Sequence, residues 1–326
     1  MLKSLEDLNR VRKLAETGQH AAVVDYLSDR PDTELKESPT LALLFGTAHA
    51  RLGRHDEGTE WVELALGKSR DRGDRTVESR ALNVRGAIAL VSGSIDEAAE
   101  YFTQALTAAR NDGDNTTIGR CSNNLGIIYN LRGRYAEAIG SYTMAIAAFQ
   151  QAGMARGLAE THHNFGITYC EQGDLDRALE EANAAVEQAE ACGDMALGGL
   201  TLRGRAEVRL RLGELKVAQK EIDRALKVHR ELEDTVEEAE DLHIVGVILA
   251  LSKKPAEAER VFNDVIERAQ ALSRPQLVAD ATRDLARVFR DAGREDEARE
   301  AARAARVLFS QLGAEAEIRK IDKAFS

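Results

Sequence analysis

The sequence contains few of the residues that mark a disulfide-stabilised or membrane-spanning protein. Its three cysteines, Cys121, Cys170 and Cys192, are too few and too widely separated to form a disulfide framework. Its four prolines fall where helices are expected to begin or in linkers. No run of about 18 apolar residues occurs, and the N-terminus is amphipathic and charged, unlike a signal peptide. We therefore expect a cytoplasmic protein that does not span a membrane.

Aromatic residues and positive charge are also scarce. Aromatic residues make up 5% of the chain, too few for a base-stacking platform, and the formal net charge is −11. Because phosphate contacts need a basic surface, this composition argues against nonspecific binding to nucleic acid. The densest acidic run, residues 231–241, is expected to be a solvated turn and helix start, or alternatively a docking point for a basic partner.

Catalytic and metal-binding motifs are absent from the sequence. It has no phosphate-cradling loop, no G-x-S-x-G and no H-E-x-x-H. His162, His163 and Cys170 are the one group of metal-binding residue types, but structural zinc needs four ligands, so a packed or groove-lining histidine is favoured. Cys121 has no histidine near it in sequence and is expected to be a buried structural thiol. We therefore expect that the protein is not an enzyme and that it binds no metal ion or cofactor.

What the sequence does contain is a unit that returns every 40 residues. Each copy has a small residue, then a glycine-led turn, then a second small residue. The first small residue is found at Gly46, Gly86, Gly126, Gly166, Ala206, Gly246 and Ala286. The turn position holds Gly53, Gly93, Gly133, Gly173, Gly213, Lys253 and Gly293, and a closing glycine follows at Gly73, Gly113, Gly153, Gly193 and Gly313. Such a period indicates an array in which each unit buries its apolar face on its neighbours.

The best copy of the unit lies in residues 123–153. It reads L-G-x-x-Y at residues 125–129, a turn at residues 132–134, and then Ala138, Tyr142 and Ala145 at helical spacing. This pattern resembles the tetratricopeptide repeat, with helices longer than in the usual repeat of about 34 residues, as in kinesin light chain and LGN-type repeats. The resemblance implies an all-α fold, a right-handed superhelical solenoid of antiparallel helix hairpins.

The resemblance covers almost the whole chain, which we expect to be a single solenoid over residues 1–326. Residues 1–34 are expected to form an irregular capping hairpin, residues 35–313 seven repeats, and residues 314–326 a capping helix. The cap should contain helices over 3–16 and 20–28 around Gly18. First helices are expected near 38–52, 75–92, 115–132, 155–172, 195–212, 235–252 and 276–292. Second helices are expected near 55–71, 95–111, 135–151, 175–191, 215–231, 255–271 and 295–311.

Each first helix carries a stripe that is separate from the side facing its partner helix. Successive residues turn by about 100°, so Arg120, Asn123, Asn124 and Ile127 lie together, away from Gly126. In the resembling family this stripe lines the concave surface, and the period transfers it to the other repeats. The stripe is apolar in the first repeat, rich in amides in the middle and mixed in charge beyond. The candidate partner-binding residues on it are Asn83, Arg120, Asn123, Asn124, His163, Asn164, Arg203, His243, Arg283 and Arg287.

The asparagines of this stripe have two interpretations. An amide offers both a donor and an acceptor, so it can pair with the backbone of a bound peptide, and similar asparagines do so in the resembling family. Asparagine has poor propensity for the middle of a helix, so its presence there indicates a role that offsets this cost. Alternatively, the asparagines bond to one another and set the packing of repeats. The arginines could likewise bind carboxylates of a partner, or be neutralised by Glu207, Asp280 and Asp284.

The graded stripe suits an extended or helical segment of another protein. We therefore expect a scaffold or adaptor that binds a peptide or protein in a concave groove. One alternative is a peptide-sensing regulatory module, either by itself or as part of a larger regulator or kinase. Another is a structural protein that assembles through its ends; a homo-oligomer is compatible with the sequence but not indicated by it. The sequence does not identify the partner.

Overall fold

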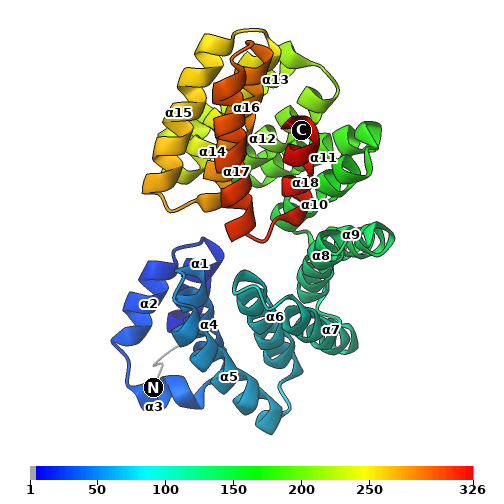
Figure 1. Ribbon diagram of the computed structural model, residues 1–326. Helices are drawn as coiled ribbons and strands as arrows, with labels where there is room; N and C mark the ends of the chain where they lie inside the picture. Colours follow the sequence, from blue (N-terminus) through cyan, green and yellow to red (C-terminus); the bar gives the residue numbers. More distant parts are fainter. Residues whose placement is uncertain (1–4, 326) are drawn as a thin grey trace. The chain divides into compact units, whose positions relative to one another are not determined.

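The computed structural model describes residues 5–325, which form α-helices α1 to α18 and no strand (Figure 1). The predicted all-α solenoid of helix hairpins is confirmed. None of the described helices is both long enough and apolar enough to cross a membrane.

Seven hairpins make up most of the chain. Their first helices are α4 (Pro39–Arg51), α6 (Arg75–Val91), α8 (Asn115–Leu131), α10 (Ala155–Gln172), α12 (Met195–Arg211), α14 (Thr235–Leu251) and α16 (Pro275–Asp291). Their second helices are α5 (His55–Arg72), α7 (Ile95–Asp112), α9 (Tyr135–Ala152), α11 (Leu175–Cys192), α13 (Leu215–Glu231), α15 (Pro255–Ala271) and α17 (Glu295–Gln311). These bounds agree with the predicted helices to within about a residue at each end, because the turn residues recur at a fixed period.

The two ends depart from the repeat. The N-terminal end contains α1 (Leu5–Glu16) and α2 (His20–Ser28), as predicted, and residues 3 and 4 of the expected first helix lie outside the described residues. A short helix that was not predicted, α3 (Asp32–Glu37), follows directly after Pro31. At the other end α18 (Glu315–Phe325) packs against α17, with Ile318 and Ile321 buried.

The chain divides into two compact units, unit 1 (Met1–Thr168) and unit 2 (Tyr169–Ser326), and each is described by itself below. Within each unit, successive first helices contact one another: α4 with α6 and α6 with α8 in unit 1, α12 with α14 and α14 with α16 in unit 2. Among the described residues of either unit, successive second helices do not approach as closely. The hairpins of each unit therefore tilt toward their first helices, and the surface that these helices present is concave.

The turns explain the spacing of the glycines. At every turn and closing position of the 40-residue period the backbone has a positive φ, as at Gly133 (68°) and Gly153 (65°). Glycine adopts this conformation without strain because it has no Cβ. Lys253, Glu233 and Ser273 stand where the period would place glycine, and they keep φ values of 61°, 55° and 54°. The period therefore imposes a left-handed residue at these three turns although the side chain opposes it.

The small residues of the first helices lie where the two helices of a hairpin touch. A Cβ on Gly126 would lie 2.5 Å from Cε1 of Tyr142, and a Cβ on Gly86 would lie 2.7 Å from the ring of Phe102. The predicted helix contact is thus confirmed at Gly126. Gly166, for which the same contact was predicted, is buried.

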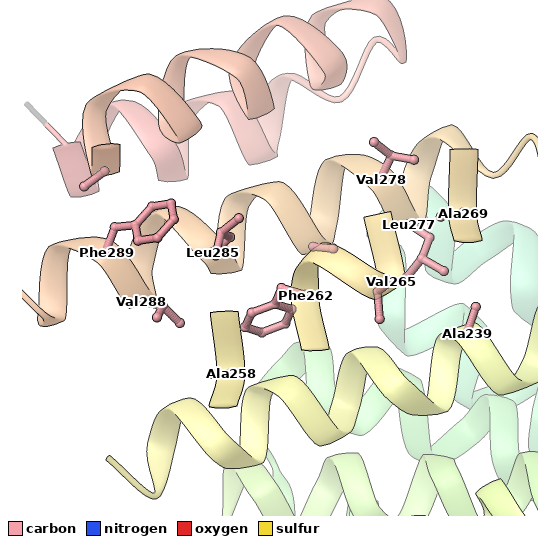
Figure 2. Packing of buried hydrophobic residues seen from close by; sticks show 12 residues of the cluster. Ala239, Ala258, Phe262, Val265, Ala269, Leu277, Val278, Leu285, Val288 and Phe289 are labelled. Atoms are coloured by element: carbon pink, nitrogen blue, oxygen red, sulfur yellow. The ribbon is translucent and has the colours of Figure 1, made fainter. Parts of the chain in front are cut away.

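The core is continuous from hairpin to hairpin inside a unit. In unit 2, the fully buried Phe262 of α15 lies in one cluster with Val288 of α16 and Ala239 of α14 (Figure 2). Burying one such large side chain stabilises the fold by about 1.5–3 kcal/mol. Because such clusters join helices of successive hairpins, one hairpin holds the next in place, and the side chains on the first helices keep a fixed register.

Candidate functional site

Each unit presents the predicted stripe on its first helices. We call these surfaces the unit 1 face and the unit 2 face. The unit 1 face consists of Arg80, Asn83, Arg120, Asn123, Asn124, Ile127, Glu160, His163, Asn164 and Ile167, on α6, α8 and α10. The unit 2 face consists of Arg203, Glu207, Glu240, His243, Asp280, Arg283, Asp284 and Arg287, on α12, α14 and α16. All ten candidate residues belong to one of the two faces.

Amide groups connect the helices of the unit 1 face. Nδ2 of Asn164 donates to Oδ1 of Asn123 at 3.1 Å, which links α10 to α8. Sγ of Cys121 donates to Oδ1 of Asn83 at 3.4 Å, which links α8 to α6. Cys121 is fully buried, and burial raises the pKa of its thiol to about 12, so it is a structural thiol. Asn123, Asn164 and Asn83 thus contribute to the packing of the repeats.

Asn124 differs from the other amides of this face. It is half-buried on α8, and its side chain has no hydrogen-bond partner among the described residues. A half-buried amide without an intramolecular partner can donate to and accept from a bound molecule. His163, also half-buried, lies on α10 next to Asn164 and is engaged by other residues of the protein.

Arg120 is the charged centre of the unit 1 face. It forms no hydrogen bond or ion pair with the described residues, although part of its side chain is exposed. Burial lowers the pKa of its guanidinium, and repulsion from Arg51 and Arg80 lowers it further, against the attraction of Glu160 and Asp114. Arg120 is therefore a cation held in a crowded, partly dehydrated position without a direct counter-ion.

Its neighbours explain why the charge of Arg120 is not neutralised. Asp114 accepts from Arg80 at 3.0 Å and also accepts from the backbone N–H of Thr117, where it caps α8. Glu160 accepts from Arg156 at 3.0 Å, one turn away on α10. Both nearby carboxylates are thus already engaged by other groups.

The unit 2 face is filled by ion pairs. Arg203 on α12 pairs with Glu237 (2.6 Å) and Asp241 (3.2 Å), both on α14, and not with Glu207. Asp241 is fully buried and also contacts Nδ1 of His229 at 2.7 Å. These acids belong to the acidic run 231–241, which therefore supplies internal ion pairs as well as a turn.

A second network joins α14, α16 and α18. Asp284 contacts Nε2 of His243 (3.0 Å) and accepts from Arg283 (3.1 Å) and Arg287 (2.6 Å). Arg283 also pairs with Glu317 of α18 at 2.8 Å. Burial alone would raise the pKa of Asp284, but the hydrogen bond from His243 and the charge of Arg283 hold it well below its usual value.

Glu207 is the one acid of the unit 2 face whose pKa is raised. It has no ion pair among the described residues, and desolvation raises the pKa of its carboxyl although Arg203, His243 and Arg211 favour the charged form. The side chain is nevertheless exposed by area. Glu207 is therefore an accessible carboxyl whose charged form is disfavoured by the protein packed around it.

The buried pair His229 and Asp241 was not predicted from the sequence. In the 40-residue period, position 229 corresponds to Ala109, Phe149 and Ala269, and position 241 corresponds to apolar or small residues in other repeats. Gly199 makes room for the ring, because a Cβ there would lie 2.4 Å from Nε2 of His229. The sequence did contain a signal for this pair. A histidine and an aspartate occupy two positions of the period that hold mostly apolar or small residues in the other repeats.

The arrangement fits recognition of another molecule more readily than chemistry. Among the described residues no three histidine, cysteine or acidic side chains are grouped so that they could hold a metal ion. The unit 1 face offers a free amide, an uncompensated guanidinium and exposed apolar side chains, which are groups that bind. The unit 2 face offers charges that satisfy one another.

Comparisons with known proteins agree with this architecture. Models of the tetratricopeptide repeat match residues 117–191 and 249–312. A comparison with curated proteins gives no significant match.

Solved structures share the fold at low sequence identity. A Rap protein complexed with competence and sporulation factor is 11% identical, with a TM-score of 0.66 over 98% of this chain and 95% of that one. The apo quorum sensor NprR from B. thuringiensis is 13% identical, with a TM-score of 0.58 over 98% and 97%. A STAND signal-transduction ATPase with a tetratricopeptide repeat sensor, from Pyrococcus horikoshii, is 14% identical, with a TM-score of 0.69 over 99% and 48%.

Proposed function

Because the chain is a tetratricopeptide-repeat protein with a protein-interaction role, we propose that it binds a peptide segment of a partner on the unit 1 face, without catalysing a reaction. The observation that carries this proposal is Asn124, a half-buried amide with no partner in the protein, at the centre of a concave surface. A peptide that covers Asn124 would exclude water from its amide. An amide left unsatisfied in that state costs about 1–3 kcal/mol, and a hydrogen bond to the peptide backbone would avoid this cost.

Asn124 lies among groups that would complete a peptide site. Asn123, the preceding residue on α8, and Asn164 on α10 are fixed by their mutual hydrogen bond, so they hold their remaining amide atoms in a defined direction. Arg120 lies one turn away on the same helix. A rigid set of polar groups binds with less loss of conformational entropy than a flexible one.

The four candidates in unit 2 have a different part in this proposal. Arg203, His243, Arg283 and Arg287 are all engaged by carboxylates of the same unit. A partner would have to break these ion pairs before it could bind there. We propose that they shape the unit 2 face, and that the contacts with the peptide come from unit 1.

The test begins with a pulldown from the native host, followed by mass spectrometry and mapping of the bound segment. The substitution Asn124→Ala should then weaken binding of a synthetic peptide of that segment by about tenfold or more. The stability of the free protein should change little, because alanine is the better helix former. Asn111→Ala, at an exposed asparagine of α7, is the matched control and should leave affinity unchanged. Equal affinity of the Asn124→Ala variant and wild type would remove the unit 1 face from the mechanism.

A peptide-sensing role is the second candidate. It is favoured by the match in fold, over nearly the full length, to a quorum sensor and to a Rap protein solved with its bound factor. A sensor, unlike a scaffold, must change conformation when it binds. Hydrogen–deuterium exchange should then change far from the peptide, in helices of unit 2, whereas a scaffold would show protection only in α6, α8 and α10.

A further inference from the structure

The unit 1 face, together with Arg51 on the neighbouring helix α4, carries more positive charge than the nearby carboxylates neutralise. Arg51 at the end of α4 and Arg120 on α8 form no ion pair with the described residues, and Arg80 on α6 bonds only to Asp114. Arg51 and Arg80 both repel the charge of Arg120, so the three guanidinium groups are close enough to act on one another. A chain with a net charge of −11 thus holds a local cationic cluster on a concave surface.

The charge of Arg51 also acts on a histidine of α2. His20 on α2 is partly buried, and burial lowers its pKa, as do the charges of Arg51 and Arg156. After burial, which is the larger cause, the two arginines add a positive field at His20. A cluster that repels protons and its own guanidinium groups attracts an anion.

Exposed apolar side chains lie on α6, α8 and α10, toward the C-terminal ends of these helices. Val91 and Leu131, at the C-terminal ends of α6 and α8, are 70% and 61% exposed, and Ile167 on α10 is 41% exposed. They correspond to one another or to neighbouring positions in the 40-residue period, so they lie at one end of the same face. A partner that covers them must present apolar groups alongside its charges.

From this juxtaposition we infer that the unit 1 face takes an amphipathic acidic peptide, whose carboxylate side chains bind Arg120 and Arg51 and whose apolar side chains cover Val91 and Leu131. This inference rests on the proposed function and states the chemistry of its peptide. Several carboxylate side chains fit better than one terminal carboxylate, because the arginines are spread over three successive first helices. Guanidinium groups bind carboxylates through paired hydrogen bonds, which would supply the missing counter-charge of Arg120.

The probe that tests the inference is a library of random 12-residue peptides displayed on phage and selected on the full chain. Selected peptides should be enriched in Asp and Glu together with Leu, Ile or Phe. A synthetic peptide of the best sequence is then titrated by fluorescence anisotropy. Arg120→Gln should weaken its binding roughly 10- to 100-fold, since hydrogen bonds to charged groups are the strong ones. Affinity should also fall as NaCl rises.

Two further variants keep the result interpretable. Arg75→Gln, at an exposed arginine at the start of α6, removes one positive charge elsewhere in unit 1 and should leave affinity within about twofold. Arg51→Gln should weaken binding several-fold and serves as the test if Arg120→Gln lowers the thermal midpoint. We expect no such loss, because Arg120 has no ion pair to break.

The outcomes separate the inference from the function on which it rests. Selection of neutral or basic peptides, or equal affinity of wild type and Arg120→Gln, would overturn the acidic partner and leave a peptide site standing. Failure to select any peptide would overturn both. A single-stranded oligonucleotide that displaces the selected peptide and binds more tightly would replace the peptide with a nucleic acid and contradict the inference.

Discussion

The two units use one backbone pattern to build opposite kinds of surface. The polar groups of the unit 1 face include several amides and an arginine without a counter-ion, whereas on the unit 2 face nearly every charge has a partner within the unit. The helices, turns and packing glycines recur in both. The difference lies in a few side chains on the stripe. The comparison shows that a repeat fixes the positions of side chains. Whether those side chains bond to one another then decides whether a face is available to a partner.

The largest change in the free energy of unfolding should come from breaking the ion pairs of unit 2. Asp284→Ala removes the carboxylate that contacts His243, Arg283 and Arg287. The two arginines then lose this counter-ion. Breaking a buried pair in this way costs about 3–5 kcal/mol. Denaturant unfolding should show that loss, whereas Asp223→Ala, at an exposed acid of α13, should change stability by less than about 0.5 kcal/mol.

The same carboxylate predicts a pH dependence. The pKa of Asp284 is lowered on folding, so its contribution is fully present above the ordinary pKa of aspartate, about 3.9, and is lost as the pH falls through the lower folded pKa. The gap in stability between wild type and Asp284→Ala should therefore narrow below about pH 4. A gap that stays constant down to pH 2 would show that the carboxylate does not act through its charge.

The packing of the hairpins should be equal in the two units. Gly126→Leu in unit 1 and Gly246→Leu in unit 2 both force a side chain into an aromatic ring, Tyr142 or Phe262. Each should cost about 1–3 kcal/mol, measured by thermal or denaturant unfolding. Gly140→Ala, on α9 with open space around it, should instead stabilise by about 1 kcal/mol. A large difference between Gly126→Leu and Gly246→Leu would mean that the units are not built alike.

Among the described residues, the non-glycine residues with a positive φ all lie in turns of unit 2. Lys253 keeps a φ of 61° where unit 1 has glycine, as at Gly133. Lys253→Gly should raise the free energy of unfolding by up to about 1 kcal/mol, because a non-glycine residue in this conformation costs about 1–2 kcal/mol. Gly133→Lys should lower it by a similar amount. If Lys253→Gly destabilises the protein, its side chain makes a contact that outweighs the strain.

The smallest change in stability should come from Glu207, the desolvated acid of the unit 2 face. Its pKa is raised on folding, so its charged form destabilises the fold, and stability falls as the pH rises from the ordinary pKa of glutamate through the folded one. Glu207→Gln should be at least as stable as wild type at pH 7, with a smaller difference at pH 4. Loss of stability at pH 7 would show that attraction to Arg203 and Arg211 outweighs desolvation.

The repeat made the fold predictable from the sequence. Gly126 and its equivalents, together with the turn glycines, located the helices, because steric demands at these positions allow few other residues. The helix α3 was missed, since it lies outside the period. The stripe positions were also predictable, whereas the partners of their side chains were not. Arg203 pairs with Glu237 and Asp241 on α14. These residues are distant in sequence, so the pattern of one helix does not reveal the pairing.

The same limit applies to the asparagines. The sequence placed Asn123, Asn124 and Asn164 on one surface, but it could not show which of them bond to one another. In the structure Asn164 is hydrogen-bonded to Asn123, which leaves Asn124 as the one of these three amides without a partner among the described residues. Small differences in side-chain direction across two helices decide this, and they depend on packing that residue spacing alone does not specify.

The central claim, that the unit 1 face is open to a partner and the unit 2 face is closed by its own ion pairs, is tested most directly by comparing two variants against one bound peptide. Asn124→Ala alters unit 1, and Arg287→Ala alters the partly exposed arginine of unit 2. Isothermal titration calorimetry with the mapped peptide should show affinity reduced about tenfold or more by Asn124→Ala and changed less than about twofold by Arg287→Ala. Full affinity in Asn124→Ala together with a large loss in Arg287→Ala would contradict the claim.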